Sequence, residues 1–170
     1  MLLVIIMELP KRKPTRLKNF DYSSNGYYFI TICTHNRENI FCNIVGQGLA
    51  PAEIKLSLFG EIANLEILDL EKRYENIKID KYVIMPNHIH AIIAIRNKSA
   101  GASPCPTLSD IVCTFKSITT RKCHKLNSKQ KIWQTSFHDH IIRGEAAYLK
   151  IWDYIDKNPA KWVEDCFYKE

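Results

Sequence analysis

The stretch Met85-Pro86-Asn87-His88-Ile89-His90-Ala91-Ile92-Ile93-Ala94-Ile95 places two histidines two residues apart inside a strongly apolar run. Its β-branched residues predict a strand. Side chains alternate between the two faces of a strand, so His88 and His90 are expected to share one open face while Ile89 points into the core. Pro86 cannot donate to a ladder, which predicts an edge or a bulge just before the histidines.

Two neutral imidazoles on one face can each give one nitrogen to a divalent metal ion. The same pair is equally compatible with two half-buried polar residues on a strand, because a lone His-x-His is weak evidence for a metal site. The pattern by itself leaves both interpretations open.

The chain has 170 residues and a formal net charge of +6. This length predicts a single domain over residues 1–170 with a sizeable core. A basic balance permits nucleic-acid binding without demonstrating it. Six scattered cysteines without a Cys-x-x-Cys pair read as reduced thiols of a cytoplasmic protein. The apolar residues 1–6 are too few to span a membrane, so no membrane partner is expected, and translation could start at Met1 or Met7.

Several other segments have clear patterns. Residues 27–34 predict a strand after the turn at 23–26, residues 43–51 a glycine-containing loop, and residues 77–79 the start of the strand that leads to the histidines. Residues 56–74 predict a helix whose buried stripe is formed by Leu58, Ile62, Leu65 and Leu68. A second helix follows the loop at 97–106, with Thr107 or Ser109 as its cap and an apolar face of Leu108, Ile111, Val112, Phe115 and Ile118.

The last helix is predicted over residues 145–158, following a short strand within 137–143 and ending near Pro159. Its buried candidates are Tyr148, Ile151, Trp152 and Ile155. Lys150, Tyr154 and Asn158 follow one another at intervals of four residues and therefore share one face of this helix. By frequency alone, a core tyrosine of an amphipathic helix is the favoured interpretation of Tyr154.

Basic residues gather in two regions. An N-terminal arm at about residues 7–20 carries five positive charges, and the second helix with its following loop lacks acids from residue 111 to 138. Both are candidate DNA-binding surfaces, although a solvated charged face would look the same. The DNA-binding candidates are Lys11, Arg12, Lys13, Arg16, Lys18, Lys116, Arg121, Lys122, Arg143 and Lys150.

Motifs in order along the chain resemble one family. Four segments resemble the single-tyrosine transposases of the IS200/IS605 type. They are the string at 85–90, the strand at 27–34 with Asn36-Arg37, the Phe-Lys-Ser-x-Thr-Thr string at 115–120, and Asp153-Tyr154-Ile155-x-x-Asn158-Pro159. These enzymes carry the HUH (His-hydrophobic-His) motif, and the likeness is strongest to the REP-associated tyrosine transposase branch.

The resemblance implies an α+β, ferredoxin-like fold, an antiparallel sheet with helices packed on one face. It implies Mg²⁺ or Mn²⁺ held by His88, His90 and Asn158, with Tyr154 as the nucleophile. The implied activity is a transposase that cleaves and joins single-stranded, hairpin-containing DNA through a covalent 5′-phosphotyrosine. His138 and His140 form a second His-x-His pair, interpreted as structural or close to DNA.

Two other functions stay open from the sequence. One is a DNA-binding protein of the same fold that does not cut, and the other is a metal-dependent phosphoesterase for small substrates that does not use Tyr154. A metal-dependent cleavage assay separates the first from the transposase, and a covalent adduct separates the second. A DNA partner implies association with the nucleoid, and both a monomer and a homodimer are open.

Overall fold

The computed structural model describes residues 16–46, 52–97 and 105–169. Its elements are β1 (Gly26–Cys33), β2 (Cys42–Val45), β3 (Glu53–Leu56), α1 (Leu58–Arg73), β4 (Ile77–Ile84), β5 (His88–Ile95), α2 (Leu108–Cys123), β6 (His138–Ile142) and α3 (Glu145–Lys157). Short 3₁₀ helices lie at His35–Arg37 and Trp162–Glu164. Within the described ranges, no helix is long and apolar enough to cross a membrane.

The central sheet has the strand order β4-β5-β1-β6, and every neighbouring pair is antiparallel. Together with α1 and α2, these strands give the chain order βαββαβ of a ferredoxin-like fold, so the predicted fold class is confirmed. Pro86 lies in the tight connection between β4 and the histidine strand β5. Thr31 on β1 pairs with His90 on one side and with His138 of the edge strand β6 on the other.

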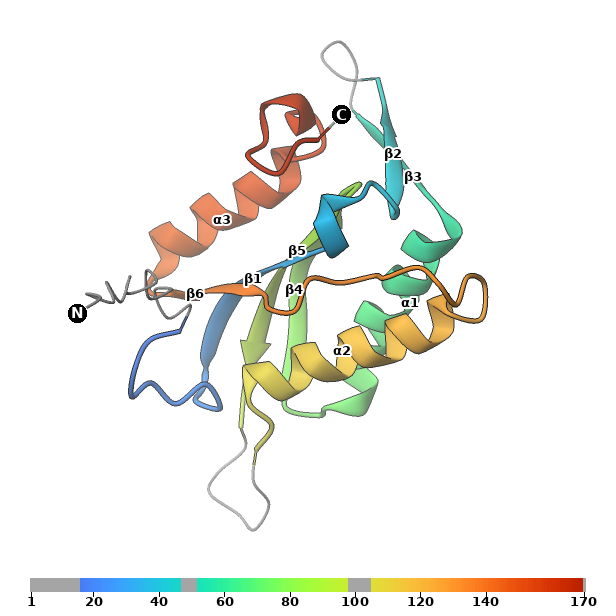
Figure 1. Cartoon of the computed structure of the whole chain (residues 1–170). Coiled ribbons are helices and arrows are strands. Elements are labelled where there is room, and N and C mark those ends of the chain that lie inside the picture. Colours follow the sequence, from blue (N-terminus) through green and yellow to red (C-terminus); the bar gives the residue numbers. More distant parts are fainter. Residues whose placement is uncertain (1–15, 47–51, 98–104, 170) are drawn as a thin grey trace, which may run out of the picture.

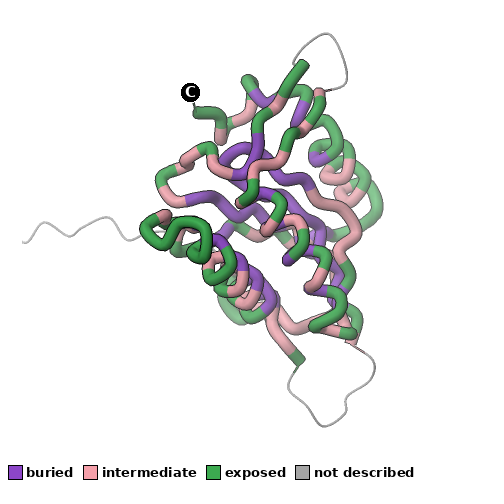
Figure 2. Tube along the Cα trace, turned by 90° about the vertical axis from the view of Figure 1, so that its right-hand side faces the viewer, coloured by how far each residue is buried: buried purple, intermediate pink, exposed green. Residues whose placement is uncertain are grey.

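Helices cover both faces of the sheet (Figure 1). The first two helices, α1 and α2, pack together against the face that presents Ile30 and Ile89. The third helix, α3, lies on the opposite face, where Ile155 packs in one cluster with Ile92. This placement differs from the expectation that all helices share one face. It explains why all eight residues of β5 are buried. Figure 2 shows that the buried parts of the chain lie in the centre of the molecule, between exposed segments.

The segment predicted as a loop at 43–51 instead contributes the strand β2 to a hairpin with β3. Ile44 and Ile54 are direct partners in this hairpin and pack beside Met85 and Trp162. The tip, residues 47–51, lies outside the described residues. Each strand has only four residues, too few for the alternation of side chains to stand out in the sequence.

The predicted buried stripe of α1 is wrong, because Leu58, Leu65 and Leu68 are 65%, 61% and 48% exposed. The helix turns another face to the core, one that contains Ile67 and other apolar residues. Part of the reason is at Gly60, where an added Cβ would lie 2.0 Å from the carbonyl oxygen of Phe41. Only glycine permits this approach, which orients α1 against the core.

Candidate metal and tyrosine site

The two histidines of β5 lie on the sheet face that α3 covers, with His88 fully buried and His90 1% exposed. The prediction that they share one face is confirmed, since their rings lie 4.4 Å apart between centroids. The face is not open as expected. Phe167, from the segment after α3, packs against both rings, at 4.7 Å from His88 and 5.9 Å from His90.

Hydrogen bonds fix the orientation of both imidazoles. The amide nitrogen of Asn87 donates to the carbonyl oxygens of Phe167 and Arg37, which leaves its Oδ1 to accept from Nδ1 of His88 at 2.9 Å. The proton therefore sits on Nδ1, and Nε2 keeps its lone pair. Nδ1 of His90 lies 2.9 Å from the hydroxyl of Thr31. Partners of this kind orient histidines that bind metals.

Nε2 of His88 is buried and has no hydrogen-bond partner among the described residues. A buried lone pair without a partner is unfavourable unless something else binds it. Burial also lowers the pKa of His88 strongly and the pKa of His90 to about 4, with the neighbouring imidazole adding to the effect on His88. Both rings are therefore neutral at physiological pH, the state in which imidazole binds a metal ion.

Tyr154 is 40% exposed, so it is not a core tyrosine. It projects from α3 toward the histidines, and its hydroxyl lies 3.2 Å from Nε2 of His90. Phe29 on β1 packs edge-on against the Tyr154 ring at 6.2 Å and stacks against His90 at 5.2 Å. The sheet and the helix thus hold the tyrosine oxygen beside an imidazole nitrogen.

Asp165 is the site residue that sequence reasoning missed. Its carboxylate accepts a hydrogen bond from the Tyr154 hydroxyl at 3.3 Å and another from the side-chain amide of Asn158. Ligand atoms of His88, His90 and Asp165 all lie within 4.8 Å of one another. Asp165 follows a proline-broken helix and belongs to no periodic pattern, so only the fold brings it to the histidines.

Asn158 ends α3 and is 3% exposed. Its Nδ2 donates to Asp165, while its Oδ1 is buried without a hydrogen-bond partner in the described part of the chain. Oδ1 is the atom through which an asparagine binds a metal. Its role as a ligand stays a prediction, and the geometry adds a carboxylate to the predicted set.

The electrostatics of the site favour a bound cation. Burial raises the pKa of Tyr154 well above its ordinary value, and the carboxylate of Asp165 raises it further. Two neutral imidazole nitrogens, a carboxylate and an amide oxygen form a donor set suited to a divalent ion such as Mn²⁺. A cation between these groups would give Nε2 of His88 and Oδ1 of Asn158 a binding partner, and its positive charge would favour the ionised form of Tyr154. The residues present therefore fit a divalent metal.

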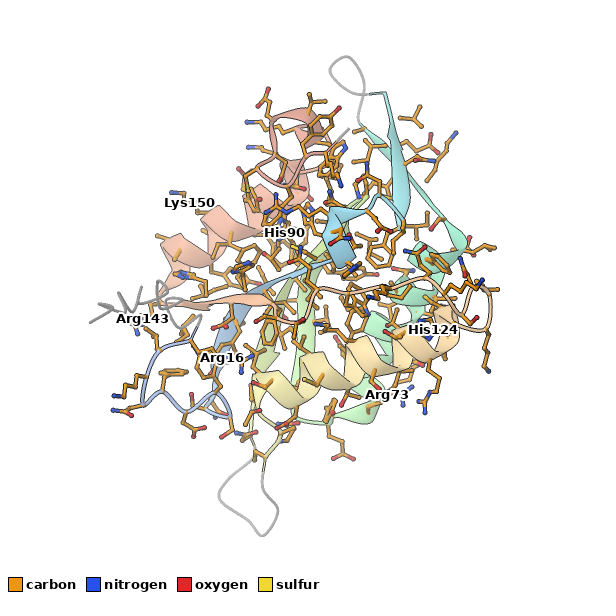
Figure 3. All side chains as sticks on the ribbon, viewed as in Figure 1. Arg16, Arg73, His90, His124, Arg143 and Lys150 are labelled. Carbon is orange, nitrogen blue, oxygen red and sulfur yellow. The ribbon has the colours of Figure 1, made fainter. Side chains whose placement is uncertain are left out.

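The predicted basic residues lie in different environments. Lys11, Arg12 and Lys13 fall outside the described residues, whereas Lys18, Arg121, Arg143 and Lys150 are exposed. Lys116 is half-buried and donates to the carbonyl oxygens of Gln134 and Thr135, and Lys122 pairs with the buried Glu66. Arg16 pairs with Asp139 at 3.7 Å. Figure 3 shows Arg16, Arg143 and Lys150 on one side of the molecule and His90 near its centre.

Comparison with known proteins identifies the family. The sequence pattern of the family described as "Transposase IS200 like" matches residues 22–158. A protein of Haemophilus influenzae described as uncharacterized is 34% identical over 172 residues, covering 92% of this chain and 93% of that protein. The REP-associated tyrosine transposase of Escherichia coli K12 is 27% identical over 145 residues, covering 84% of this chain and 73% of that protein.

This chain therefore belongs to the IS200-like transposase family, whose members cleave DNA. The predicted family is confirmed, and the Escherichia coli relative carries the name of the predicted branch. The fold agrees as well. A solved structure of a REP-associated tyrosine transposase bound to a REP hairpin has a TM-score of 0.61 at 20% identity, covering 86% of this chain and 73% of that one.

Proposed function

We propose that this chain is a metal-dependent enzyme that cleaves and rejoins single-stranded DNA through Tyr154. The observation that carries the proposal is the position of the Tyr154 hydroxyl, 3.2 Å from an imidazole nitrogen and 3.3 Å from a carboxylate oxygen. A phosphodiesterase that ignored Tyr154 would not require its hydroxyl at the donor set. Membership of a DNA-cleaving family supports the same reaction class.

The residues that would hold the metal are His88, His90 and Asp165, with Oδ1 of Asn158 as a further donor. When bound, Mg²⁺ or Mn²⁺ supplies positive charge that offsets the phosphate and favours the ionised form of a nearby hydroxyl. Asn87 and Thr31 hold the two rings so that their Nε2 atoms face the site. Phe29 and Phe167 shield the histidines from water.

The reaction exchanges one phosphodiester for another. The Tyr154 oxygen attacks phosphorus, a bond forms between them, and the bond from phosphorus to the 3′ oxygen of the DNA breaks. The tyrosine proton passes to solvent and the departing 3′ oxygen takes one up from solvent, so the number of protons does not change. The Asp165 carboxylate orients the tyrosine hydroxyl, from which it accepts a hydrogen bond at 3.3 Å. The 5′ phosphate stays on Tyr154, and attack by a 3′ hydroxyl reverses these changes and reseals a strand without ATP.

A stripe of lysines on α3 and the turn after it offers a path for the DNA backbone. Lys150, Lys157 and Lys161 follow the same face as Tyr154 and line a cavity of about 360 Å³ beside it. Lys157 and Lys161 were not among the predicted DNA-binding residues, although their spacing from Lys150 was visible in the sequence. Lysines at this position can contact the phosphates on either side of the cleaved bond.

The DNA partner that we propose is a single strand that contains a hairpin. Support comes from the solved structure with the same fold, which is described as bound to a REP hairpin. A flexible single strand reaches a half-buried tyrosine more easily than a duplex does, because its backbone can bend into the site. We propose action at the nucleoid on this basis, and the homodimer stays a prediction.

The experiment that tests the proposal is the capture of a covalent adduct. Purified protein is incubated with labelled single-stranded hairpin DNA and Mn²⁺ or Mg²⁺, and the adduct is resolved on a denaturing gel. Tyr154→Phe removes one oxygen and should abolish the adduct while DNA binding persists. Tyr148→Phe is the matched control on the same helix, since its hydroxyl bonds to Asp80 at 3.1 Å. An adduct that survives in Tyr154→Phe refutes the proposal.

A further inference from the structure

We infer that a cavity at the outer edge of β6, formed around Asp139, Arg16 and Arg143, binds one nucleotide of the single strand and reads guanine there. The inference rests on the proposed single-stranded DNA substrate. The cavity has a volume of about 450 Å³ and is lined by Arg16, Leu17, Tyr22, Asp139, His140, Ile141, Arg143 and Ala147. It shares none of its lining residues with the donor set of the tyrosine site.

The first observation is a buried carboxylate in the wall of this cavity. The side chain of Asp139 is 2% exposed, and its Oδ1 has no hydrogen-bond partner within the described ranges. Arg16 lies 3.7 Å from this oxygen, close enough to balance its charge but beyond hydrogen-bond distance. A buried carboxylate oxygen in this state can accept a hydrogen bond from an N–H donor of a ligand.

The second observation is the arrangement of positive and aromatic groups around the carboxylate. The guanidinium of Arg16 is held over the ring of Phe137 at 4.7 Å and near the ring of Tyr22 at 5.8 Å. Arg143 also lines the cavity and is exposed, and Figure 3 shows both arginines on the same side of the molecule. Arginines of this kind bind phosphates, and aromatic rings accept stacked bases.

A nucleotide carries the two groups that this cavity can bind. Its anionic phosphate suits the arginines, and the N–H donors of its flat base suit the carboxylate. Guanine presents two adjacent N–H donors on its Watson–Crick edge, which match the two oxygens of one carboxylate. Cytosine and adenine each present one amino donor there and thymine presents one imino N–H, so none of the three offers two adjacent donors. The chemistry therefore favours guanine, with its phosphate toward Arg143.

The position in the sheet lets one DNA strand reach this cavity and the tyrosine site together. Thr31 separates His90 on β5 from His138 on β6, so the two histidine positions lie about 10 Å apart across the sheet. Asp139 is the next residue along β6, where it pairs with Ile30, so its side chain lies on the opposite face of the sheet from the tyrosine site. A strand that occupies both sites therefore passes around the outer edge of β6. In the described part of the chain β6 has no strand on its outer side, so a nucleotide can approach this edge.

The test is a binding assay with full-length Tyr154→Phe protein, which removes cleavage from the measurement. The probes are fluorescent oligothymidylates with or without one central guanine, measured by fluorescence anisotropy. We expect the guanine probe to bind roughly 5- to 150-fold more tightly, as a good bidentate base contact provides. Equal binding of the two probes, or no binding of either, would overturn the inference but leave the proposed cleavage function intact, because that function is tested by the covalent adduct with hairpin DNA.

Two variants locate the effect. Asp139→Asn should remove most of the preference for guanine, with Asp69→Asn on the exposed side of α1 as its control and thermal melting as a check of folding. Arg143→Ala leaves the Arg16–Asp139 pair untouched. It should weaken the binding of both probes equally and lower the salt dependence of binding by about one released counterion. Lys72→Ala on α1 is its control. The assignment would be contradicted if folded Asp139→Asn still preferred the guanine probe. It would also be contradicted if Arg143→Ala bound both probes as tightly as the parent protein does.

Discussion

Replacing Asp165 with asparagine should weaken metal binding without disturbing the fold. The change keeps the shape of the side chain but removes the negative charge from the donor set of His88, His90 and Asp165. Loss of even an indirect partner of a metal ligand typically costs about 10- to 100-fold in affinity, so we expect at least that range. At a Mn²⁺ concentration one hundred times the wild-type dissociation constant, binding stabilises the native protein by about 2.7 kcal/mol.

In Asp165→Asn, the same Mn²⁺ concentration should contribute only about 0.4 to 1.4 kcal/mol to the free energy of unfolding. A chain of this size gains about 2–4 °C in Tm for each kcal/mol. The Mn²⁺-induced rise in Tm should therefore fall from about 5–11 °C in the wild type to about 1–6 °C in the variant. Differential scanning calorimetry with and without Mn²⁺ measures both values.

The control for this experiment is Asp153→Asn, which makes the same charge change on the exposed face of α3. Asp153 pairs with Lys157 and contributes no atom to the donor set. Its Mn²⁺-induced rise in Tm should equal that of the wild type. If Asp165→Asn and Asp153→Asn respond alike, the carboxylate of Asp165 does not bind the metal and the reasoning fails.

Further predictions concern stability. Ile67→Ala should lower the free energy of unfolding by about 2–5 kcal/mol because Ile67 is 2% exposed, whereas Leu65→Ala at 61% exposure should change it by less than about 0.5 kcal/mol in the same urea titration. Thr107→Ala should cost about 0.5–2 kcal/mol, since Thr107 and Asp110 form a capping box at the start of α2. Hydrogen bonds from Thr107 lower the pKa of Asp110, so this stabilisation is present above pH 3.8 and is lost as the pH falls through the lowered pKa. Urea titrations at neutral and at strongly acidic pH should therefore show the deficit of Thr107→Ala shrinking in acid, and a deficit independent of pH would contradict this explanation.

Local patterns predicted the elements that depend on local chemistry. The alternation that places His88 and His90 on one face follows from strand geometry alone, and the cap of α2 at Thr107 follows from its side chain. The stripe of α1 could not be chosen in the same way, because the helix has leucines on more than one side. Its true inner face includes Glu66, which is buried only because Lys122 and Arg73 reach it from α2 and from the last turn of α1.

The site was predictable only as far as the motifs extend. The strand and helix patterns placed His88, His90 and Tyr154, and the structure brings the tyrosine to the histidines. The sequence assigns no role to Asn87 or Asp165, because neither residue belongs to a strand or helix periodicity that would predict its orientation. Asp165 reaches the site through the turn after Pro159, and such a turn has no sequence signal strong enough to fix its direction.

The two halves of the site belong to parts of the molecule that differ in how easily they open. His88 and His90 begin β5, which has partners on both sides and is buried on both faces, so its amide hydrogens should exchange with solvent only when the whole domain unfolds. Tyr154 lies on α3, which has Ile155 as its only buried residue and starts at Gly144 with a φ of 89°. This helix can separate from the sheet at a lower cost than global unfolding, so the two histidines can keep their geometry while Tyr154 and Asn158 are displaced together.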